Sequence, residues 1–287
     1  MDYLRKCNFK KMEKILLFLQ SEMTRPQPWG WFHWMWIFIT IGSIVCLTVT
    51  KHSEKKLRII LLVYGIIAAA LELTKQVIWT VNYDALTDMF IHDYQWYAAP
   101  FQLCTTPLYV SIVCGLLKDC KLRQSLLSYM SFVTILGGFM TLLIPESCFV
   151  ETIQVNIHTM WLHCGGFVVS VYLLASGVVK LNRQNLLKAI AVFVEFVFVA
   201  LAINVIVYHS GVLNGETFNM FYISPYFISS LPVFNTIQQN TPYIVFLLIY
   251  VLALSLGATI VYLLAHGVSH MVHLCQNKIK NIHLHHH

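Results

Sequence analysis

The chain has 287 residues, of which 57% are apolar and only 11% are charged. Its apolar residues form blocks of about 20 residues, the length that an α-helix needs to cross a bilayer. This composition excludes a soluble globular protein and argues against nucleic acid as a partner. The eight cysteines show neither the paired spacing of a disulfide framework nor a zinc-binding CxxC motif. We therefore expect an all-α, multi-pass protein of the cell membrane, with no metal and no soluble cofactor.

Residues 1–30 precede the first apolar block, and their helical spacing of apolar and basic residues predicts an interfacial amphipathic segment. One transmembrane domain is then expected over residues 31–265, followed by a cytoplasmic tail at 266–287 with a histidine-rich end. The connection 209–241 has no Lys or Arg and several turn signals, so we expect it to fold back as a lid. The domain divides into seven expected spans, at about 31–50, 57–81, 97–117, 124–144, 152–176, 186–208 and 242–265.

Basic residues gather in alternate loops of this arrangement. The loops after the first, third and fifth expected spans, together with the C-terminal tail, carry twelve Lys and Arg, and the other loops between spans carry none. By the positive-inside rule, the N-terminus lies outside and the C-terminus is cytoplasmic. Six further Lys and Arg in residues 1–30 oppose this orientation, and we attribute them to contact with anionic lipid headgroups.

Cys104 lies between Pro100 and Pro107 at the start of the third expected span. Pro100 suits the first turn of a helix, where its missing N–H costs nothing. Pro107 would fall inside that helix and free the carbonyl of Leu103, so we expect a kinked and partly unsatisfied backbone around Cys104. Such backbone is tolerated at membrane depth only where it is buried in protein or lines a cavity. Cys104 is thus a candidate nucleophile, the alternative being a small buried apolar residue.

Further polar residues fall in the same outer half of the expected bundle. Ionisable groups inside a membrane are costly and by default mark a functional cavity. Glu72 and Lys75 of the second span are three residues apart on one helix face, so they can alternatively neutralise each other as a structural pair. The residues are Glu72 and Lys75 in the second span, His158 and His163 in the fifth, His33 in the first and Asn204 in the sixth.

The two histidines of the fifth span are five residues apart. On an α-helix that spacing separates them by about 140°, so His158 and His163 cannot both face one point. Gly165 and Gly166 let another helix approach closely beside His163. We therefore favour His163 as the partner of Cys104.

Short motifs carry a resemblance over residues 29–265. They are Trp31-Phe-His33, Glu72-Leu-Thr-Lys75, Pro100-Phe-Gln-Leu-Cys104, His163-Cys-Gly-Gly with the rest of its span to Leu174, Thr217-Phe-Asn-Met-Phe-Tyr222 with Pro225, and Pro242-Tyr243. On these motifs the chain resembles the YwaF-like family of bacterial seven-span membrane proteins. It is also similar, more distantly, to a eukaryotic transmembrane acyltransferase family that makes polyunsaturated ether phospholipids.

The resemblance implies catalytic roles for Cys104 and His163, although the eukaryotic relative lacks the Phe-Gln-Leu between proline and cysteine. We expect a thiol acyltransferase that moves an acyl chain from a phospholipid to a lysophospholipid or another lipid-linked acceptor. Cys104 would form the thioester, His163 would act as base, and Glu72 would orient the imidazole. The candidates for substrate binding are Lys75, His33, His158, Asn204, Asn219 and Tyr222.

A second hypothesis belongs to another class of protein. In a transporter or lipid-binding protein, Glu72, Lys75 and His163 would line a polar pathway. The seven unlike spans show no inverted repeat, which argues against secondary transport. Membrane phospholipids and lysophospholipids are the expected partners, and the sequence does not indicate an oligomeric state.

Overall fold

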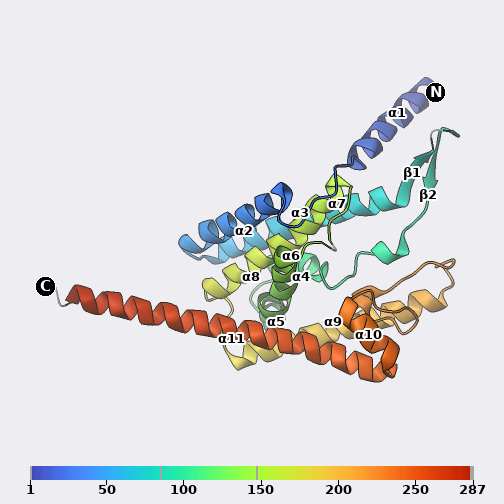
Figure 1. Ribbon diagram of the computed structural model, residues 1–287. Coiled ribbons are helices and arrows are strands. Elements are labelled where there is room, and N and C mark those ends of the chain that lie inside the picture. Colours follow the sequence, from blue (N-terminus) through green and yellow to red (C-terminus); the bar gives the residue numbers. More distant parts are fainter. Residues whose placement is uncertain (1, 85, 147, 285–287) are drawn as a thin grey trace.

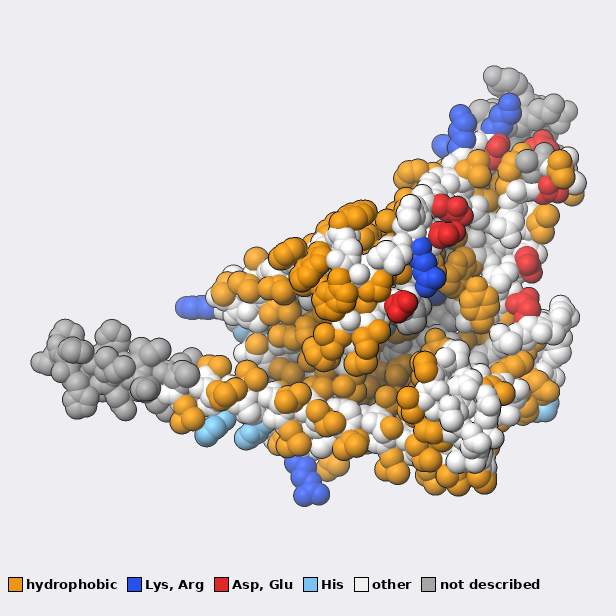
Figure 2. Space-filling view, viewed as in Figure 1, with side chains coloured by type: hydrophobic (Ala, Val, Ile, Leu, Met, Phe, Trp, Pro, Cys, Tyr) orange, Lys and Arg blue, Asp and Glu red, His pale blue; other side chains and the backbone are white. Residues whose placement is uncertain are grey.

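The computed structural model describes residues 2–84, 86–146 and 148–284. Within that part of the chain, six helices are long and apolar enough to cross a membrane, and Figure 1 shows how they are arranged. Apolar side chains cover the middle of the molecule, while charges gather toward its ends (Figure 2). A mostly helical, multi-pass architecture is therefore confirmed, with six such helices where the sequence predicted seven spans. The six helices are Trp31–Val49, Glu54–Thr80, Lys121–Leu143, Ile153–Ala175, Arg183–His209 and Tyr243–Val272.

The chain begins with helix α1 (Asp2–Leu19), followed by an extended segment that leads to α2 (Trp31–Val49). The backbone of this segment bonds to residues just before and within α7 (Ile153–Met160), because Met23 N–H donates to the Glu151 carbonyl and Ile153 N–H donates to the Ser21 carbonyl. Helix α3 (Glu54–Thr80) begins at a side-chain cap, where Ser53 Oγ accepts from the Lys56 N–H at 3.1 Å.

A two-stranded antiparallel hairpin follows α3, a feature that the sequence did not predict. Strand β1 (Val81–Asp84) pairs with β2 (Met89–His92), with Val81 opposite His92 and Asp84 opposite Met89. Tyr83 Oη donates to Asp88 Oδ1 at 2.6 Å, and this hydrogen bond raises the pKa of Tyr83 to about 12. We call this side of the bundle the hairpin end.

The third expected span is only partly helical. A short 3₁₀ turn, η1 (Trp96–Ala98), is followed by non-helical backbone, and helix α4 begins only at Thr106 and ends at Leu116. Pro107 therefore lies in the first turn of α4 rather than inside a helix, and Pro100 precedes the turns around Cys104 rather than a helix. The Leu103 carbonyl accepts from Thr106 Oγ1 at 2.8 Å, so it is not left unsatisfied. The irregular backbone at Cys104 was expected, but the cause assigned to it was wrong.

Two of the long helices contain a π-helical segment near their middle. The first consists of α5 (Lys121–Tyr129), the π-helix η2 (Met130–Thr134) and α6 (Ile135–Leu143). The second consists of α7, the π-helix η3 (Trp161–Gly165) and α8 (Gly166–Ala175). Such segments are rare and are frequent at functional sites.

The remaining elements close the bundle. Helix α9 (Arg183–His209) leads into a connection that contains η4 (Met220–Tyr222) and α10 (Pro232–Asn240). The last helix, α11, runs without a break from Tyr243 to Leu284, well past residue 265 where the sequence placed the end of the last span.

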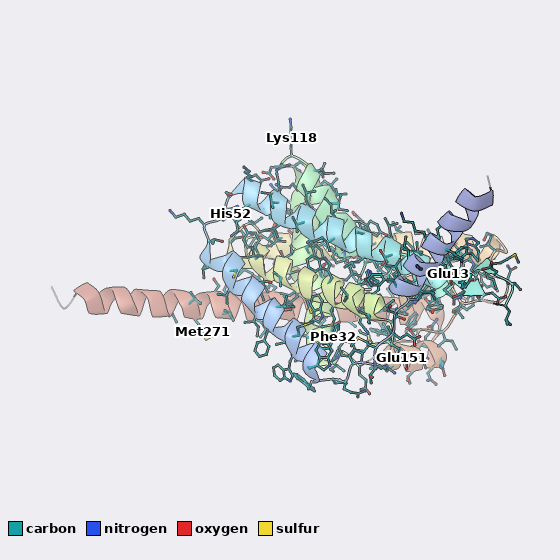
Figure 3. All side chains as sticks on the ribbon, turned by 90° about the horizontal axis from the view of Figure 1, so that it is seen from above. Glu13, Phe32, His52, Lys118, Glu151 and Met271 are labelled. Atoms are coloured by element: carbon teal, nitrogen blue, oxygen red, sulfur yellow. The ribbon has the colours of Figure 1, made fainter. Side chains whose placement is uncertain are left out.

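Opposite the hairpin end, the first turns of α3 meet the last turn of α4. Arg58 joins the two helices, because Nη1 donates to the Gly115 carbonyl at 3.1 Å and Nη2 donates to the Leu117 carbonyl at 2.7 Å. Figure 3 shows His52 and Lys118 at this side, with Glu13 and Glu151 at the other. We call it the basic end, since the loops after α2, α4 and α8 bring their Lys and Arg here.

Candidate functional site

A buried charge cluster lies on α3 near the hairpin end, centred on Glu72. One carboxylate oxygen, Oε1, lies 2.7 Å from Lys75 Nζ and accepts a hydrogen bond from Gln76 Nε2, also at 2.7 Å. The other, Oε2, lies 2.7 Å from Nε2 of His158 on α7. Glu72, Lys75 and His158 are 4%, 7% and 3% exposed. A carboxylate withdrawn from water is tolerated only with such partners, which is why α3 and α7 are held together here.

The cluster has a spare hydrogen-bonding atom. Nδ1 of His158 is buried and has no hydrogen-bond partner among the described residues. A buried polar atom without a partner costs free energy comparable to a lost hydrogen bond. This nitrogen is therefore available to a substrate, a water or a second side chain, which a purely structural ion pair does not require.

Close packing between α3 and α4 sets the level of Cys104. Gly115 lies against Leu62, and Gly65 lies against the backbone of Leu108 and Ile112. The two helices are thus antiparallel, and Leu108 packs with Ala68. Because α4 begins at Thr106, Cys104 lies beyond this contact, in the direction in which α3 continues to Glu72.

Electrostatic contacts agree with this level. The half-buried Cys104 thiol lies within electrostatic range of both Lys75 and Glu72. It is also within range of the phenols of Tyr64, Tyr129 and Tyr222. Cys104 therefore lies toward the same end of the bundle as Glu72 and Lys75, although these residues come from different segments of the chain.

His163 lies farther from the hairpin end than His158 and packs beside an earlier turn of α3. Its neighbour Leu162 offers its carbonyl to Tyr64 Oη at 3.0 Å and packs against Ala68. Its own ring hydrogen-bonds the backbone of Gly137 on α6. Glu72 therefore contacts His158, whereas the sequence hypothesis assigned it to orienting His163.

The π-helix η3 explains why the helical-wheel argument was incomplete. A π-helix bonds each residue to the fifth one along, so residues five apart lie nearer to one face than they do on an α-helix. The 140° separation expected for a uniform α-helix does not hold across residues 161–165.

The connection between α9 and α11 folds back over the Cys104 turn, in the manner expected of a lid. Gln102 Nε2 donates to the Asn219 carbonyl at 3.0 Å, and Gln102 Oε1 accepts from the Phe221 N–H at 2.9 Å. The rings of Phe101 and Phe221 stack with their centroids 5.6 Å apart. Gln102 and Phe101, which shortly precede Cys104, thus contact the lid directly.

Two bulky lid residues have strained backbone. Phe221 and Tyr222 adopt φ of 58° and 59°, in the left-handed region that large side chains avoid. Such conformations cost about 1–3 kcal/mol each and persist where surrounding contacts impose them. Asn204 supplies two of these contacts, because it donates to the Met220 carbonyl at 3.0 Å and accepts from the Met220 N–H at 2.7 Å.

Three residues predicted to bind substrate instead hold the chain in place. Asn204 fixes the lid as described, and Asn219 accepts from the Ser224 N–H at 2.7 Å and donates to the Phe227 and Ile228 carbonyls. His33 accepts from the Trp29 N–H at 3.0 Å, so its other nitrogen donates to the Leu142 carbonyl at 3.1 Å. Both ring nitrogens of His33 are occupied by backbone, which leaves neither for a ligand.

The sequence analysis missed two glutamines that organise this region. Gln76 joins Glu72 to the Ala98 carbonyl at 2.8 Å, and Gln102 holds the lid. Gln76 was detectable as the residue one helical turn after Glu72, and Gln102 as the polar residue within Pro100-Phe-Gln-Leu-Cys104. Among the described residues, no group of three His, Cys, Asp or Glu is placed to hold a metal ion.

The comparisons with known proteins give one match. No curated protein and no solved structure matches the chain. A family model, that of the TMEM164 family of transmembrane proteins, matches residues 28–272. This range includes all six long helices, the Cys104 turn, the Glu72 cluster and the lid, and the chain therefore belongs to the TMEM164 family.

Proposed function

We propose that the protein is a membrane acyltransferase that moves an acyl chain between phospholipids through a thioester on Cys104. The observation that carries the proposal is the shared position of the Cys104 thiol and the buried Lys75–Glu72–His158 cluster. A thiol near a histidine–carboxylate pair is the arrangement that activates a cysteine nucleophile. Membership of the family and the resemblance to the ether-phospholipid acyltransferases support the same chemistry.

The reaction consists of two exchanges. A histidine takes the Cys104 proton, the thiolate attacks the ester carbonyl of a phospholipid, and the C–O bond breaks as the histidine returns that proton to the departing lysophospholipid. The acceptor hydroxyl then gives its proton to the histidine and attacks the thioester, and the C–S bond breaks to regenerate the thiol. A backbone N–H or Lys75 stabilises the negative oxygen in each step. Neither step requires coenzyme A.

Two histidines are candidates for the base. The resemblance implies His163, which we retain as the first candidate. The geometry adds His158, because it contacts Glu72 and has an unpartnered ring nitrogen. In the second case, Glu72 orients the base itself, as the carboxylate of a catalytic triad does.

The same proposal includes the topology. Residues 97–117, with α4 as their helical part, cross the membrane as a seventh span. The positive-inside rule then puts the basic end and the C-terminal end of α11 in the cytoplasm. The irregular backbone of this span is covered by the lid, which satisfies the requirement that such backbone be buried in protein. Cys104 then lies in the half facing away from the cytoplasm, where an outer-leaflet phospholipid presents its ester. The membrane is the cell membrane in this proposal.

The test is transfer of a labelled acyl chain from a phospholipid to a lysophospholipid in liposomes containing the purified protein, with and without acyl-CoA. We expect transfer without acyl-CoA, and a loss of about a thousandfold or more for Cys104→Ala and Cys104→Ser. Cys46→Ala is the matched control, since Cys46 is an exposed thiol of α2. Normal transfer by the Cys104 variants, or transfer that requires acyl-CoA, contradicts the proposal.

His163→Gln and His158→Gln identify the base in the same assay. If His163 is the base, His163→Gln is inactive and His158→Gln retains activity, and the reverse result selects His158. Measurable uptake of a small solute that depends on Glu72 and Lys75, without any acyl transfer, would favour the alternative of a transporter.

A further inference from the structure

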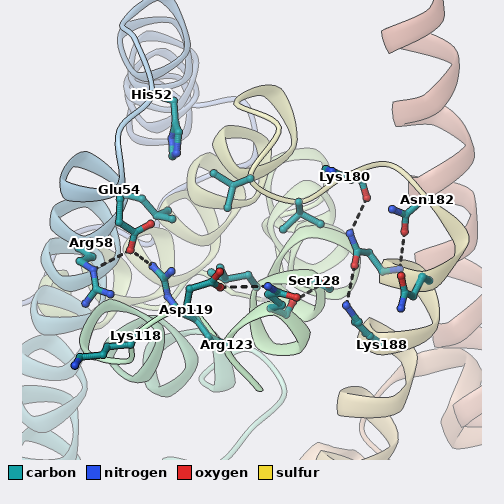
Figure 4. Close-up of a pocket in the computed structure, with 17 residues that line it drawn as sticks. His52, Glu54, Arg58, Lys118, Asp119, Arg123, Ser128, Lys180, Asn182 and Lys188 are labelled. Atoms are coloured by element: carbon teal, nitrogen blue, oxygen red, sulfur yellow. Dashed lines mark hydrogen bonds and ion pairs between the residues drawn. The ribbon is translucent and has the colours of Figure 1, made fainter. Parts of the chain in front are cut away.

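A second polar site lies at the basic end, far from Cys104. Here the structure has a cavity of about 840 Å³ between the loops that precede α5 and α9 and the first turns of α3 (Figure 4). The cavity and the Glu72 cluster are connected by a single helix, since Glu54 and Glu72 are 18 residues, or about 27 Å, apart on α3. None of the residues proposed for acyl transfer lines this cavity.

The lining is cationic. Five Lys or Arg line the cavity, namely Arg58, Lys118, Arg123, Lys180 and Lys188, against two acids, Glu54 and Asp119. Both acids are already engaged. The Glu54 carboxylate lies 2.8 Å from Arg58 Nε and 2.8 Å from Arg123 Nη2, while Asp119 accepts from Gln124 Nε2 at 3.3 Å. The three lysines have no acid partner among the described residues, so the cavity carries an excess of positive charge.

The two arginines form its fixed wall. Arg123 is 2% exposed, donates to the Cys114 carbonyl at 2.8 Å and reaches Glu54, and Arg58 bonds the last carbonyls of α4. Figure 4 shows the Glu54 carboxylate between these two guanidinium groups. Burying an arginine is costly. The buried and bonded position of Arg123 is therefore not explained by a need for positive charge in the loops alone.

The helix N-termini add to the positive electrostatic potential in the cavity. Helices α3, α5 and α9 all begin at this cavity, and the N-terminus of a helix carries a partial positive charge. Ser53 and Asn182 cap α3 and α9, whereas α5 begins at Cys120 with no side-chain cap. The first N–H groups of α5 are therefore open to an anionic acceptor beside the lysines.

The floor is apolar. Leu57, Leu127 and Val179 line the cavity and are 1%, 4% and 3% exposed. Cationic walls over an apolar floor, at the end of a membrane bundle, match a phospholipid better than a free anion. Basic pockets between membrane helices bind anionic headgroups by this combination.

We propose that this cavity binds the phosphate-bearing headgroup of an anionic phospholipid in the leaflet at the basic end. The simpler explanation is that these lysines only set topology, as basic residues in loops commonly do. The two explanations differ in one respect. A topology signal depends on how many basic residues a loop holds, whereas a binding site depends on which of them line the cavity.

The chain offers matched variants for this distinction. Lys118, Lys180 and Lys188 line the cavity, whereas Lys51, Lys55 and Arg183 lie at the same end of the molecule, are exposed and do not line it. Replacing either group of three with Glu changes the net charge by the same amount. Both triple variants are compared with the full-length wild-type protein in detergent after confirming that each elutes as a folded species.

The probes are dioctanoyl phosphatidylglycerol, dioctanoyl phosphatidylcholine and glycerol 3-phosphate, with binding measured by calorimetry. We expect phosphatidylglycerol to bind at least about tenfold more tightly than phosphatidylcholine, and the lining variant to lose about tenfold or more of that affinity. The control variant should lose less than about threefold, and raised salt should weaken wild-type binding. If the lining variant does not fold, the single variant Lys180→Glu, in the loop between α8 and α9, is measured instead.

Equal losses in both triple variants, or no preference for phosphatidylglycerol, would overturn the proposal. Glycerol 3-phosphate binding as tightly as phosphatidylglycerol would overturn the choice of a lipid. Acyl transfer is not measured in this experiment, so its outcome is independent of the function proposed for Cys104.

Discussion

The two charged regions of this membrane protein differ in how their charges are balanced. Around Glu72, the lysine, the carboxylate and the histidine are buried and each lies 2.7 Å from a partner in the cluster, while Nδ1 of the histidine has no partner among the described residues. At the basic end, the Glu54 carboxylate is shared between two arginines, and the lysines line an open cavity (Figure 4). The first arrangement supports chemistry on a substrate that enters the bundle, and the second supports attraction of an anion from outside. The difference predicts how each region responds to substitution.

The largest expected effect comes from removing the buried carboxylate. Glu72→Gln leaves Lys75 as a buried cation without an anion, and we expect a loss of about 3–5 kcal/mol in the free energy of unfolding. Adding Lys75→Met should recover most of this loss, because the unpaired charge is gone. Asp119→Asn is the matched substitution at the basic end, where the exposed carboxyl only accepts a 3.3 Å hydrogen bond from Gln124 and should matter much less. Thermal unfolding in detergent measures all three, and equal destabilisation by Glu72→Gln and Asp119→Asn would show that burial does not distinguish the regions.

The next effect concerns the packing that places Cys104 beside the cluster. A Cβ added at Gly65 would lie 2.7 Å from Ile112 Cγ1 and 3.2 Å from backbone atoms of α4, so Gly65→Ala should destabilise the protein by about 1–3 kcal/mol. It should also lower acyl transfer by shifting α4 and the Cys104 turn away from α3. Gly42→Ala, with nothing within 4 Å of the new methyl, is the control and should be neutral or slightly stabilising. A stable Gly65→Ala protein with full activity would argue against the α3–α4 register as the cause of the site geometry.

A smaller and more local effect is expected at the lid. Gln102→Leu removes the acceptor of the Phe221 N–H and the donor to the Asn219 carbonyl, at a cost of about 1–3 kcal/mol confined to the lid. Faster amide hydrogen exchange in residues 219–228, with unchanged exchange in α3, is the expected signature. Gln95→Leu, which loses only contacts to Asp93 near the hairpin, should leave that exchange unaltered. Unchanged exchange in Gln102→Leu would mean that the lid is held by its apolar contacts alone.

The smallest effect is expected from the lysines at the basic end. Lys118→Ala and Lys180→Ala remove exposed charges that have no acid partner among the described residues, so we expect the unfolding temperature to change by less than about 2 °C. A stabilisation by phosphatidylglycerol that is present in the wild type and absent from these variants would sharpen the contrast with Glu72. A large loss of stability without lipid would instead place these lysines in the same structural class as Lys75.

The sequence predicted those parts of the fold that depend on length and on the cost of burying charge. Six of the seven apolar blocks of membrane-spanning length form long helices, and the cost of intramembrane charge is consistent with the pairing of Glu72 and Lys75. Pro107 was misassigned because a proline suits either the first turn of a helix or a kink, and the choice depends on where α4 begins. At that start, the hydroxyls of Thr105 and Thr106 donate to the Gln102 and Leu103 carbonyls, which sequence periodicity does not report.

Other features could not be predicted because they depend on contacts between distant segments. Asn219 and His33 are of residue types that often bind ligands, but backbone groups occupy their hydrogen-bonding atoms. The cavity at the basic end is assembled from three loops, and its basic residues are indistinguishable in sequence from ordinary topology signals. The π-helical segments have no characteristic amino-acid composition, so the sequence does not reveal them. One of them changes the expected angular separation of His158 and His163 around the helix axis.

The π-helix at residues 161–165 also has a consequence for comparing this chain with its relatives. A π-turn is equivalent to one residue inserted into an α-helix, and each α-helical residue advances the chain by about 100°. Because the π-turn takes up the extra residue within one turn, deleting one residue from this segment would restore a regular α-helix with α8 in nearly the same orientation relative to α7. The faces that contact Glu72 and Gly137 would still be presented together, but the two histidines would be four positions apart instead of five. A relative that lacks one residue here is therefore expected to carry its histidine at a shifted position, and an alignment without a gap would match the wrong pair.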